Sequence, residues 1–450
     1  MTLAQKIGYG ALAAAVVGAF VISEILVLPR KTSDRETVVY WEKWTGSEGE
    51  AMRKVVEAFN ASQDQYEVKM LTVTAIQNKT MLATAGAVPP DVAGLFGDNV
   101  AQYASSNAVR PLDDLIERDG IKREDYIPVY WDICSMGGMT WCMPSTPAST
   151  ALHYNLDHWR EAGLDPNKPP KTIEELDQMV DKVSKIKVNG SQKTIDRAGF
   201  LPAEPGWWRA QFGYIFGGQL WNPETGELTC DSPENIRAFT WTKTYVDKFG
   251  FQAVNDFKGG FGAFSSPDNP FISGKVSSVL QGVWMANFIK EYSKDGALKW
   301  AAVPFPHPAD RPDLADSTYA GLDILTIPKG AKNVEGAWAF IKFVQSQKGM
   351  EMLCLAQGKH TPLVKVSEEF WKEHRNPYIK LFHSLAFSKN AKAPPQLGIW
   401  PEYAAELENA FDKINRGTDP GEALRYVKQR IQPKLDREIK LRQKREEAAQ

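Results

Sequence analysis

The chain has few cysteines and no excess of one charge. Its 450 residues include four cysteines, and 53 basic residues nearly balance 55 acidic ones, for a net charge of −2. No two cysteines are spaced as Cys-x-x-Cys, which argues against the common zinc sites. The balanced charge gives no electrostatic basis for binding nucleic acid, which usually requires a basic surface. We therefore expect no metal, no cofactor and no nucleic-acid partner.

The motifs of common enzyme families are also missing. The chain has no Gly-x-Ser-x-Gly segment, and Lys275 is followed by Val276 where a phosphate-binding loop needs Ser or Thr. His153 and His158 are five residues apart, which does not match the two ligands of an HExxH zinc site. We expect that the protein is not an enzyme. A pair of carboxylates leaves no such motif, so a glycosidase remains an alternative.

The first 36 residues have the pattern of a signal or anchor segment followed by a linker. Lys6 precedes an apolar run at 8–28, and about 20 residues suffice to span a bilayer. Glu24 lies near one end of this run, and no small-x-small cleavage site follows it. We predict an uncleaved membrane anchor, with a cleaved signal peptide as the alternative. Either one places the body of the protein in the periplasm or at the cell surface.

Cys134 and Cys142 flank the two glycines of a predicted hairpin. A two-residue loop at 137–138 would pair Cys142 with Ile133 and direct the two sulfurs to opposite faces. A three-residue loop at 137–139 would instead place Cys134 directly across from Cys142. Because an exported protein folds under oxidising conditions, we expect the disulfide.

Alternating strand and helix patterns begin at residue 37. We expect strands at 37–44 and 66–73, helices at 49–60 and 77–87, and a third strand beginning near 88–92. This order is typical of a doubly wound parallel sheet. Further along, Thr172 and Glu175 form a capping box that opens another helix.

Taken together, the chain from about 37 to 431 resembles the extracellular solute-binding proteins (family 1) of ABC sugar importers. The segments that carry the resemblance are 44–48 (WTGSE), 89–92 (PPDV), 153–155 (HYN), 162–164 (AGL), 172–176 (TIEEL), 217–220 (GGQL), 282–284 (GVW) and 335–343 (EGAWAFIKF). Ser47 stands where that family has proline, and Val276-Ser277-Ser278 replaces its Ala-Met.

The resemblance implies an α/β, two-lobed periplasmic-binding-protein fold of type II. Each lobe is then a doubly wound, mostly parallel sheet with flanking helices, and a hinge of three crossings joins the lobes. We expect a signal or anchor segment and linker at 1–36, lobe 1 at 37–146 plus 279–319, and lobe 2 at 147–278 plus 320–433. A charged tail should occupy 434–450.

Candidate ligand-binding residues lie where strands end, which is where open α/β sheets bind ligands. An indole can stack on the C–H face of a sugar, and carboxylates and amides can bind its hydroxyls. The candidates are Trp44, Glu48, Asp98, Asn99, Trp208, Trp284, Gly321, Asp323 and Trp400. The sequence does not decide whether Trp208 or its neighbour Trp207 faces the ligand.

The resemblance implies a binding component that captures a carbohydrate, an oligosaccharide above all, and delivers it to an ABC permease. We expect a monomer that is exported or anchored to the membrane. One alternative is a hydrolase that uses Asp98 and Asp323, or Glu42 and Glu48, as acid and base. The other is a ligand-sensing module for a membrane receptor.

Overall fold

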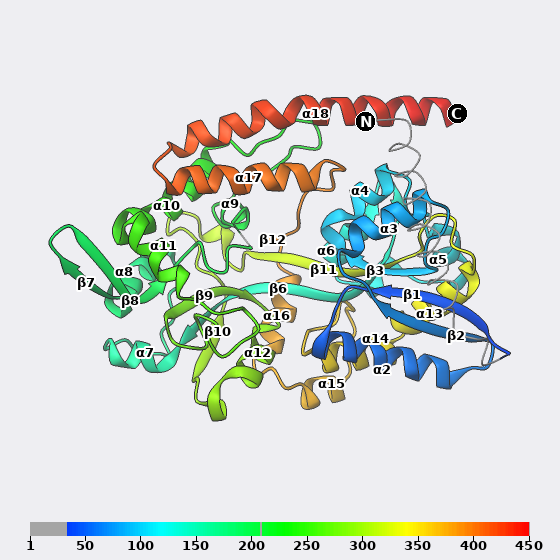
Figure 1. The fold of residues 1–450 in the computed structure, drawn as a ribbon, viewed down its shortest axis with the longest axis horizontal. Helices are drawn as coiled ribbons and strands as arrows, with labels where there is room; N and C mark the ends of the chain where they lie inside the picture. The colour runs from blue at the N-terminus through cyan, green and yellow to red at the C-terminus, as the bar shows by residue number, and fades with distance from the viewer. Residues whose placement is uncertain (1–33, 208, 450) are drawn as a thin grey trace, which may run out of the picture.

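The computed structural model describes residues 34–207 and 209–449, which form two halves joined by long strands (Figure 1). The predicted anchor lies outside the described residues. Within residues 34–207 and 209–449, no helix is both long enough and apolar enough to cross a membrane.

The strands and helices alternate along the chain. The strands are β1 Glu36–Glu42, β2 Tyr66–Thr72, β3 Val92–Phe96, β4 Ser135–Met136, β5 Met139–Thr140, β6 Met143–Asn155, β7 Lys185–Asn189, β8 Gln192–Phe200, β9 Val276–Gly282, β10 Trp300–Val303, β11 Thr318–Thr326 and β12 Ala391–Lys392. The α-helices are α2 Gly46–Ser62, α3 Ile76–Ala85, α4 Val100–Ser105, α5 Asp113–Asp119, α6 Pro128–Cys134, α7 Leu156–Glu161, α8 Ile173–Val183, α9 Gln211–Ile215, α10 Pro233–Phe249, α11 Phe251–Gly259, α12 Met285–Tyr292, α13 Val334–Gln345, α14 Gln347–Gln357, α15 Glu368–Glu373, α16 Ile379–Ala386, α17 Trp400–Asn415 and α18 Pro420–Ala449. Short 3-10 helices are η1 Gly97–Asn99, η2 Arg123–Asp125, η3 Lys294–Gly296 and η4 Pro312–Leu314.

One mixed sheet runs through both halves in the order β2-β1-β3-β11-β6-β9-β8-β7, with β10 on β6 and β12 on β11. Strands β2, β1 and β3 are parallel, as the alternation of strands and helices predicts. In the other half β8 and β9 are parallel, whereas β6 is antiparallel to both β9 and β11. The two-lobed α/β prediction is confirmed.

The strand β6 is the longest of the described strands, with 13 residues that are all buried. Its first half pairs with β11 and its second half with β9, so this one strand connects the two halves of the sheet. The strand continues through Pro144 and Pro147, because the pairing with β11 shifts register between Leu322 and Ile324 at these prolines.

The hydrophobic cores divide the chain differently from the expected lobe boundaries. Leu325, Trp338 and Phe382 pack in the same core as β1 and α2, although we expected residues 320–433 in lobe 2. The chain re-enters the other core at Leu397. The strands β6 and β11 and residues 387–396 connect the two cores. The segment 280–305 contacts both, because Leu280 and Phe305 pack in the second core and Val283 and Ala302 in the first.

The predicted charged tail is part of a longer helix. Helix α18 continues to Ala449, and Leu435 within it is buried in the second core. Glu438 accepts hydrogen bonds from the backbone N–H groups of Gly398 and Ile399, at 2.9 and 3.0 Å. The helix extends along the top of the molecule from the second half toward the first (Figure 1).

Cys134 and Cys142 are free, buried thiols, so the expected disulfide is absent. Strands β4 and β5 pair Ser135 with Thr140 and Met136 with Met139, which leaves a two-residue loop at 137–138. This is the loop length for which the sequence predicted that the sulfurs do not face each other. Cys134 itself is the last residue of α6 rather than a strand residue.

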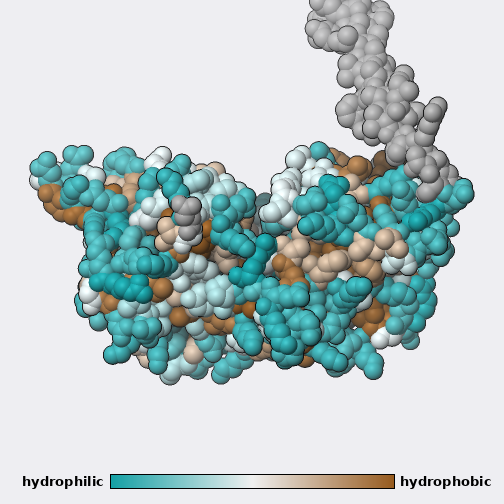
Figure 2. Space-filling model, turned by 90° about the horizontal axis from the view of Figure 1, so that it is seen from below, coloured by the Kyte–Doolittle hydropathy of each residue, from teal (hydrophilic) through white to brown (hydrophobic). Residues whose placement is uncertain are grey.

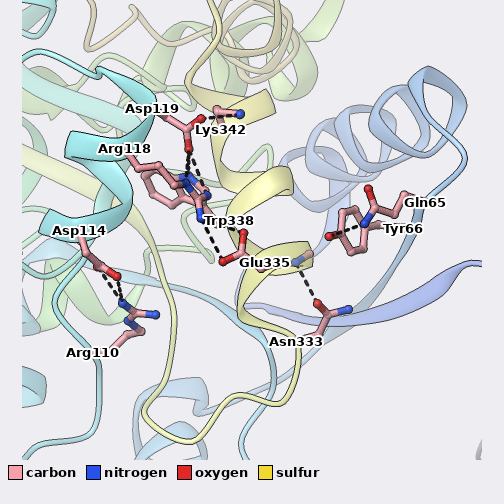
Figure 3. Close-up of polar contacts among 11 residues, drawn as sticks. Gln65, Tyr66, Arg110, Asp114, Arg118, Asp119, Asn333, Glu335, Trp338 and Lys342 are labelled. Atoms are coloured by element: carbon pink, nitrogen blue, oxygen red, sulfur yellow. Dashed lines mark hydrogen bonds and ion pairs between the residues drawn. The ribbon is translucent and has the colours of Figure 1, made fainter.

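Helix α13 is fixed to the first half by a polar seam (Figure 3). Trp338 is 1% exposed, and its Nε1–H donates to Asp119 Oδ2 at 2.6 Å. Asp119 also pairs with Lys342 at 2.8 Å, and these bonds hold the pKa of Asp119 at about 2. Arg118 extends the seam to Glu335 at 3.0 Å. The seam supports placing α13 in the first lobe.

We predict that Trp338→Ala lowers the free energy of unfolding by about 3–5 kcal/mol, because it leaves a cavity in the first core. Trp338→Phe keeps most of the ring but loses the bond to Asp119, and should cost about 1 kcal/mol. Urea denaturation followed by circular dichroism measures both. Equal losses for the two variants would contradict a role dominated by packing.

Candidate functional site

Three strands bring their ends together between the two halves. Parallel strands β1 and β3 end on the same edge, and antiparallel β11 places Asp323 opposite Phe96 at the end of β3. Lys43 and Trp44 follow β1 directly, and α2 then places Glu48 in its first turn. The space-filling view shows that the surface is hollowed where the halves meet (Figure 2).

A β-bulge orients the central carboxylate. The pairing between β11 and β6 matches Leu322 with Pro147 and Ile324 with Pro144, so Asp323 lies opposite two residues instead of one. Thr146, one of these two, donates its hydroxyl to Asp323 Oδ2 at 2.8 Å. Bulges are frequent beside binding sites because they redirect a side chain out of the regular pleat.

Two lysines neutralise the buried carboxylates. Lys43 Nζ lies 3.3 Å from Asp323 Oδ1 and 3.8 Å from Glu42 Oε1. Lys359 Nζ, from the loop after α14, lies 3.2 Å from Asp323 Oδ2 and 3.0 Å from Glu48 Oε1. The side chains of Lys43 and Lys359 are 6% and 3% exposed, so water hydrates their charges poorly. The carboxylate partners compensate for that lost hydration.

The Trp44 indole is half-buried beside this cluster. Its Nε1–H donates to Asp323 Oδ2 at 2.9 Å, and its ring meets Phe96 edge-on at 5.5 Å between centroids. Lys43 Nζ and Lys359 Nζ lie 5.3 and 5.2 Å from the ring centroid, within the range of cation–π attraction. The indole is therefore held in one orientation before any ligand binds.

The cluster strongly changes proton affinities. Burial on its own raises the pKa of Asp323, but Lys43, Lys359 and the bonds from Thr146 and Trp44 outweigh it and bring this pKa to about 2. Burial likewise lowers the pKa of Lys359, but Glu48 and Asp323 outweigh it and raise this pKa. Asp323 and Lys359 are therefore both charged at neutral pH.

Asp98 has a different environment. It lies in η1, half-buried, and accepts a hydrogen bond from the Tyr319 hydroxyl at 3.0 Å. The pKa of Asp98 is raised to about 6. Burial is the main cause, the hydrogen bond from Tyr319 opposes it, and the negative charge of Asp323 adds to it. The pKa of Tyr214 in α9 is also raised. Burial is the larger cause, and the negative charge of Asp98 is the smaller one.

Trp284 is the residue directly before α12. It is half-buried against the first core, and its ring covers Gly282, where an added Cβ would come within 2.4 Å of the indole. One turn later in α12, Asn287 donates to the backbone carbonyl of Gln357. Gln357 in turn donates to the Glu48 carbonyl at 3.2 Å. This chain of contacts links α12 to the cluster around Lys359.

The remaining candidates have varied surroundings. Asn99 donates to Gln102 at 3.3 Å beside Asp98. Gly321 is buried in β11, where an added Cβ would meet the Tyr319 ring at 3.4 Å, so a side chain covers it. Trp400 is 8% exposed and packs on Tyr403 in the second core. Trp208 lies outside the described residues.

Four residues of the site were not anticipated. They are Lys43, Thr146, Tyr319 and Lys359. Lys43 adjoins Trp44, and Tyr319 lies in the expected crossing, so their neighbours gave a signal. Lys359 follows Gly358, a helix C-cap with φ +64°, in a loop with no recognisable motif. Across the described residues, no three His, Cys, Asp or Glu side chains are grouped to hold a metal ion.

A model of the family "Bacterial extracellular solute-binding protein" matches residues 43–351. The chain belongs to this family. The match begins directly after β1 and includes the hinge strands β6 and β11. It also includes Lys43, Glu48 and Asp323 of the charged cluster, whereas Lys359 lies after its end. Members of the family are solute-binding proteins that act outside the cytoplasm.

Relatives with assigned ligands share about a fifth of their residues with the chain. The maltotriose-binding protein of Pyrococcus abyssi is 20% identical over 323 residues, which are 71% of this chain and 65% of that protein. The chain thus spans slightly under two thirds of that relative. The sn-glycerol-3-phosphate-binding protein UgpB of Escherichia coli K12 is 21% identical over 355 residues, which are 75% of this chain and 76% of UgpB.

Solved structures confirm the fold. CpMnBP1 with mannotriose bound has a TM-score of 0.75 and 26% identity, and the alignment covers 88% of this chain and 99% of that one. MalE, the sugar-binding protein of Xanthomonas citri, has a TM-score of 0.74 and 20% identity over 90% of this chain and 99% of MalE. The family's two-lobed fold therefore extends over nearly all of the described residues.

We predict that Lys359→Met lowers the free energy of unfolding at pH 7 by about 3–5 kcal/mol, because it leaves Glu48 without its cation and Asp323 with Lys43 alone. The pKa of Asp323 should rise toward its ordinary value. Stability from a lowered carboxylate pKa is present above about pH 4 and lost as the pH falls toward 2, so the difference from wild type should shrink below pH 4.

Denaturant titrations at pH 7 and pH 3 measure this difference. Lys342→Met provides the control, because Lys342 is half exposed and pairs with Asp119 at the surface. It should cost less than about 1 kcal/mol. A cost for Lys359→Met no larger than that of the control would show that the cluster is not electrostatically coupled.

Proposed function

We propose that the protein captures a carbohydrate, an oligosaccharide above all, between its two lobes and delivers it to an ABC permease. The observation that carries this proposal is the arrangement at the strand ends. A half-exposed indole, Trp44, is fixed beside the carboxylates of Glu48 and Asp323, with Asp98 on the same edge of the sheet. Sugars are recognised by this combination of an aromatic plane and fixed hydrogen-bond acceptors.

Similarity to known proteins supports the same ligand class. The maltotriose-binding relative and the mannotriose complex of CpMnBP1 both involve sugar trimers. A trimer is large enough to contact both lobes at once. Trp44 and Trp284 would then offer aromatic surfaces, with Asn99 adding an amide.

Closure of the lobes would couple binding to transport. The strands β6 and β11 and residues 387–396 connect the two cores, so the halves can rotate about these segments. A ligand that contacts both halves binds the closed state more tightly and shifts the population toward it. The permease would recognise that closed state. We propose that a monomer performs this cycle in the periplasm or at the cell surface, tethered by the segment before residue 34.

Hydrolysis is the second candidate, because the pKa values of Asp98 and Asp323 differ as an acid and a nucleophile would require. The contacts of Asp323 argue against it. Its Oδ2 accepts bonds from Trp44 and Thr146 and pairs with Lys359, while Oδ1 pairs with Lys43. A carboxylate with both oxygens engaged is a poor nucleophile. Oligosaccharide recovered intact after incubation would exclude this activity.

We predict that Trp44→Ala weakens oligosaccharide binding at least about thirtyfold, because it removes both the stacking plane and the donor to Asp323. The oligosaccharide affinity of Trp44→Phe should lie between those of Trp44→Ala and the wild type. Native mass spectrometry of the protein from its source identifies a carried ligand, and isothermal titration calorimetry with that ligand measures affinity.

Trp371→Ala is the matched control, since this indole of α15 is half-buried away from the strand ends. It should leave affinity unchanged. A carried ligand that is not a saccharide, with no response to sugars, would refute the proposed function.

A further inference from the structure

The relatives leave the charge of the ligand open. One binds maltotriose, which is uncharged, and another binds sn-glycerol 3-phosphate, which is an anion. The two ligands make opposite demands on a site, because a buried phosphate needs a free cation or several N–H donors. The charges at the strand ends of this chain distinguish between them.

Acids outnumber bases at these strand ends. The described carboxylates are Glu42, Glu48, Asp98 and Asp323, and the described ammonium groups are those of Lys43 and Lys359. The two lysines each contact two carboxylates, and their side chains are almost fully buried. An anionic ligand could recruit them only by breaking these ion pairs inside the protein. That exchange would leave buried carboxylates unpaired.

Asp98 adds an uncompensated negative charge. Its described polar partner is the Tyr319 hydroxyl, and no lysine or arginine among residues 34–207 and 209–449 forms an ion pair with it. It is half-buried at the strand ends of the first half and close enough to Tyr214 of the second core to raise the pKa of that residue. The neighbouring Gln211 is 1% exposed and its Oε1 has no partner. Gln211 donates to Thr150, whose hydroxyl accepts from the Tyr319 N–H, so this acceptor belongs to the same network.

We infer that the site selects uncharged or basic saccharides and rejects anionic ones, and that Asp98 is the residue that enforces the rejection. This inference rests on the proposed function. A hydroxyl or a protonated amino group can donate to Asp98. A carboxylate or phosphate in the same place would face like charge as the lobes close and exclude water.

Sugar trimers that differ only in charge test the inference. For each of three backbones, β-1,4-glucose, α-1,4-glucose and β-1,4-mannose, the unmodified trimer is compared with its 2-amino and its C6-uronate forms by calorimetry at pH 7.5. On any backbone that binds, the uronate should bind at least about tenfold more weakly than the unmodified trimer. The amino form should bind at least as tightly. Glycerol and sn-glycerol 3-phosphate form a further pair, in which the phosphate should give no advantage.

Two variants assign the effect to one residue. Asp98→Asn should reduce the ratio between unmodified and uronate affinity at least about fivefold, because the amide keeps the shape and loses the charge. Asp64→Asn removes one negative charge at a fully exposed position that pairs with Arg35, and should leave the ratio unchanged. Equal changes in both variants would indicate a general effect of net charge and overturn the role of Asp98.

The outcomes separate this inference from the proposed function. A uronate or phosphate that binds as tightly as its uncharged counterpart, or an anionic saccharide carried by the protein from its source, overturns the inference and leaves sugar capture intact. If no trimer binds and the carried ligand is not a saccharide, both fall together. If an uncharged or basic saccharide is carried and Asp98→Asn relaxes the discrimination, both stand.

Discussion

The ion-paired cluster around Asp323 is the constraint on which the rest of the site depends. Its carboxylate lies on β11, one of the strands that connect the two cores, and it contacts Trp44, Thr146 and Lys359. Removing several charges from water is costly, and the arrangement is stable only because each charge meets an opposite one. The cluster therefore fixes Trp44, Lys43 and Lys359 together. Geometry that would otherwise vary with side-chain rotation is set before a ligand arrives, which lowers the entropy lost on binding.

The same cluster lies at the hinge. Asp323 is held on β11, Thr146 on β6, and Lys359 on a loop of the first lobe. Relative motion of the lobes must leave these contacts intact, because breaking them would expose unpaired charge to a poorly hydrated interior. Motion is then confined to the parts of β6 and β11 beyond Thr146 and Asp323, toward the second lobe. A rigid site in one lobe and a mobile second lobe are what capture by closure requires.

Local sequence patterns predicted the elements well and the boundaries between lobes poorly. The capping box at Thr172 and Glu175 forms with both of its hydrogen bonds, and the first βα units lie where hydrophobic periodicity placed them. The lobe of residues 320–386 could not be read from local patterns, because it depends on which core the long-range contacts join. Trp338 carries the same helical pattern in either lobe, and only its bond to Asp119 shows which one it joins. The number of tryptophans was a weak guide to sugar binding, because Trp159, Trp338 and others are buried in the cores.

Some residues of the site could be found from local sequence patterns and others could not. Trp44, Glu48 and Asp98 follow strands and could be found from the rule that ligands bind at strand ends. Lys359 could not, because it reaches the cluster from a loop more than 300 residues after Glu48 and belongs to no motif. Its presence changes the chemistry of the whole site. Without it the strand ends would hold four carboxylates against one lysine, which would suit a metal ion or a polycation. With it, Asp323 and Glu48 share a cation, and Asp98 is the carboxylate of the four that has no described ion pair.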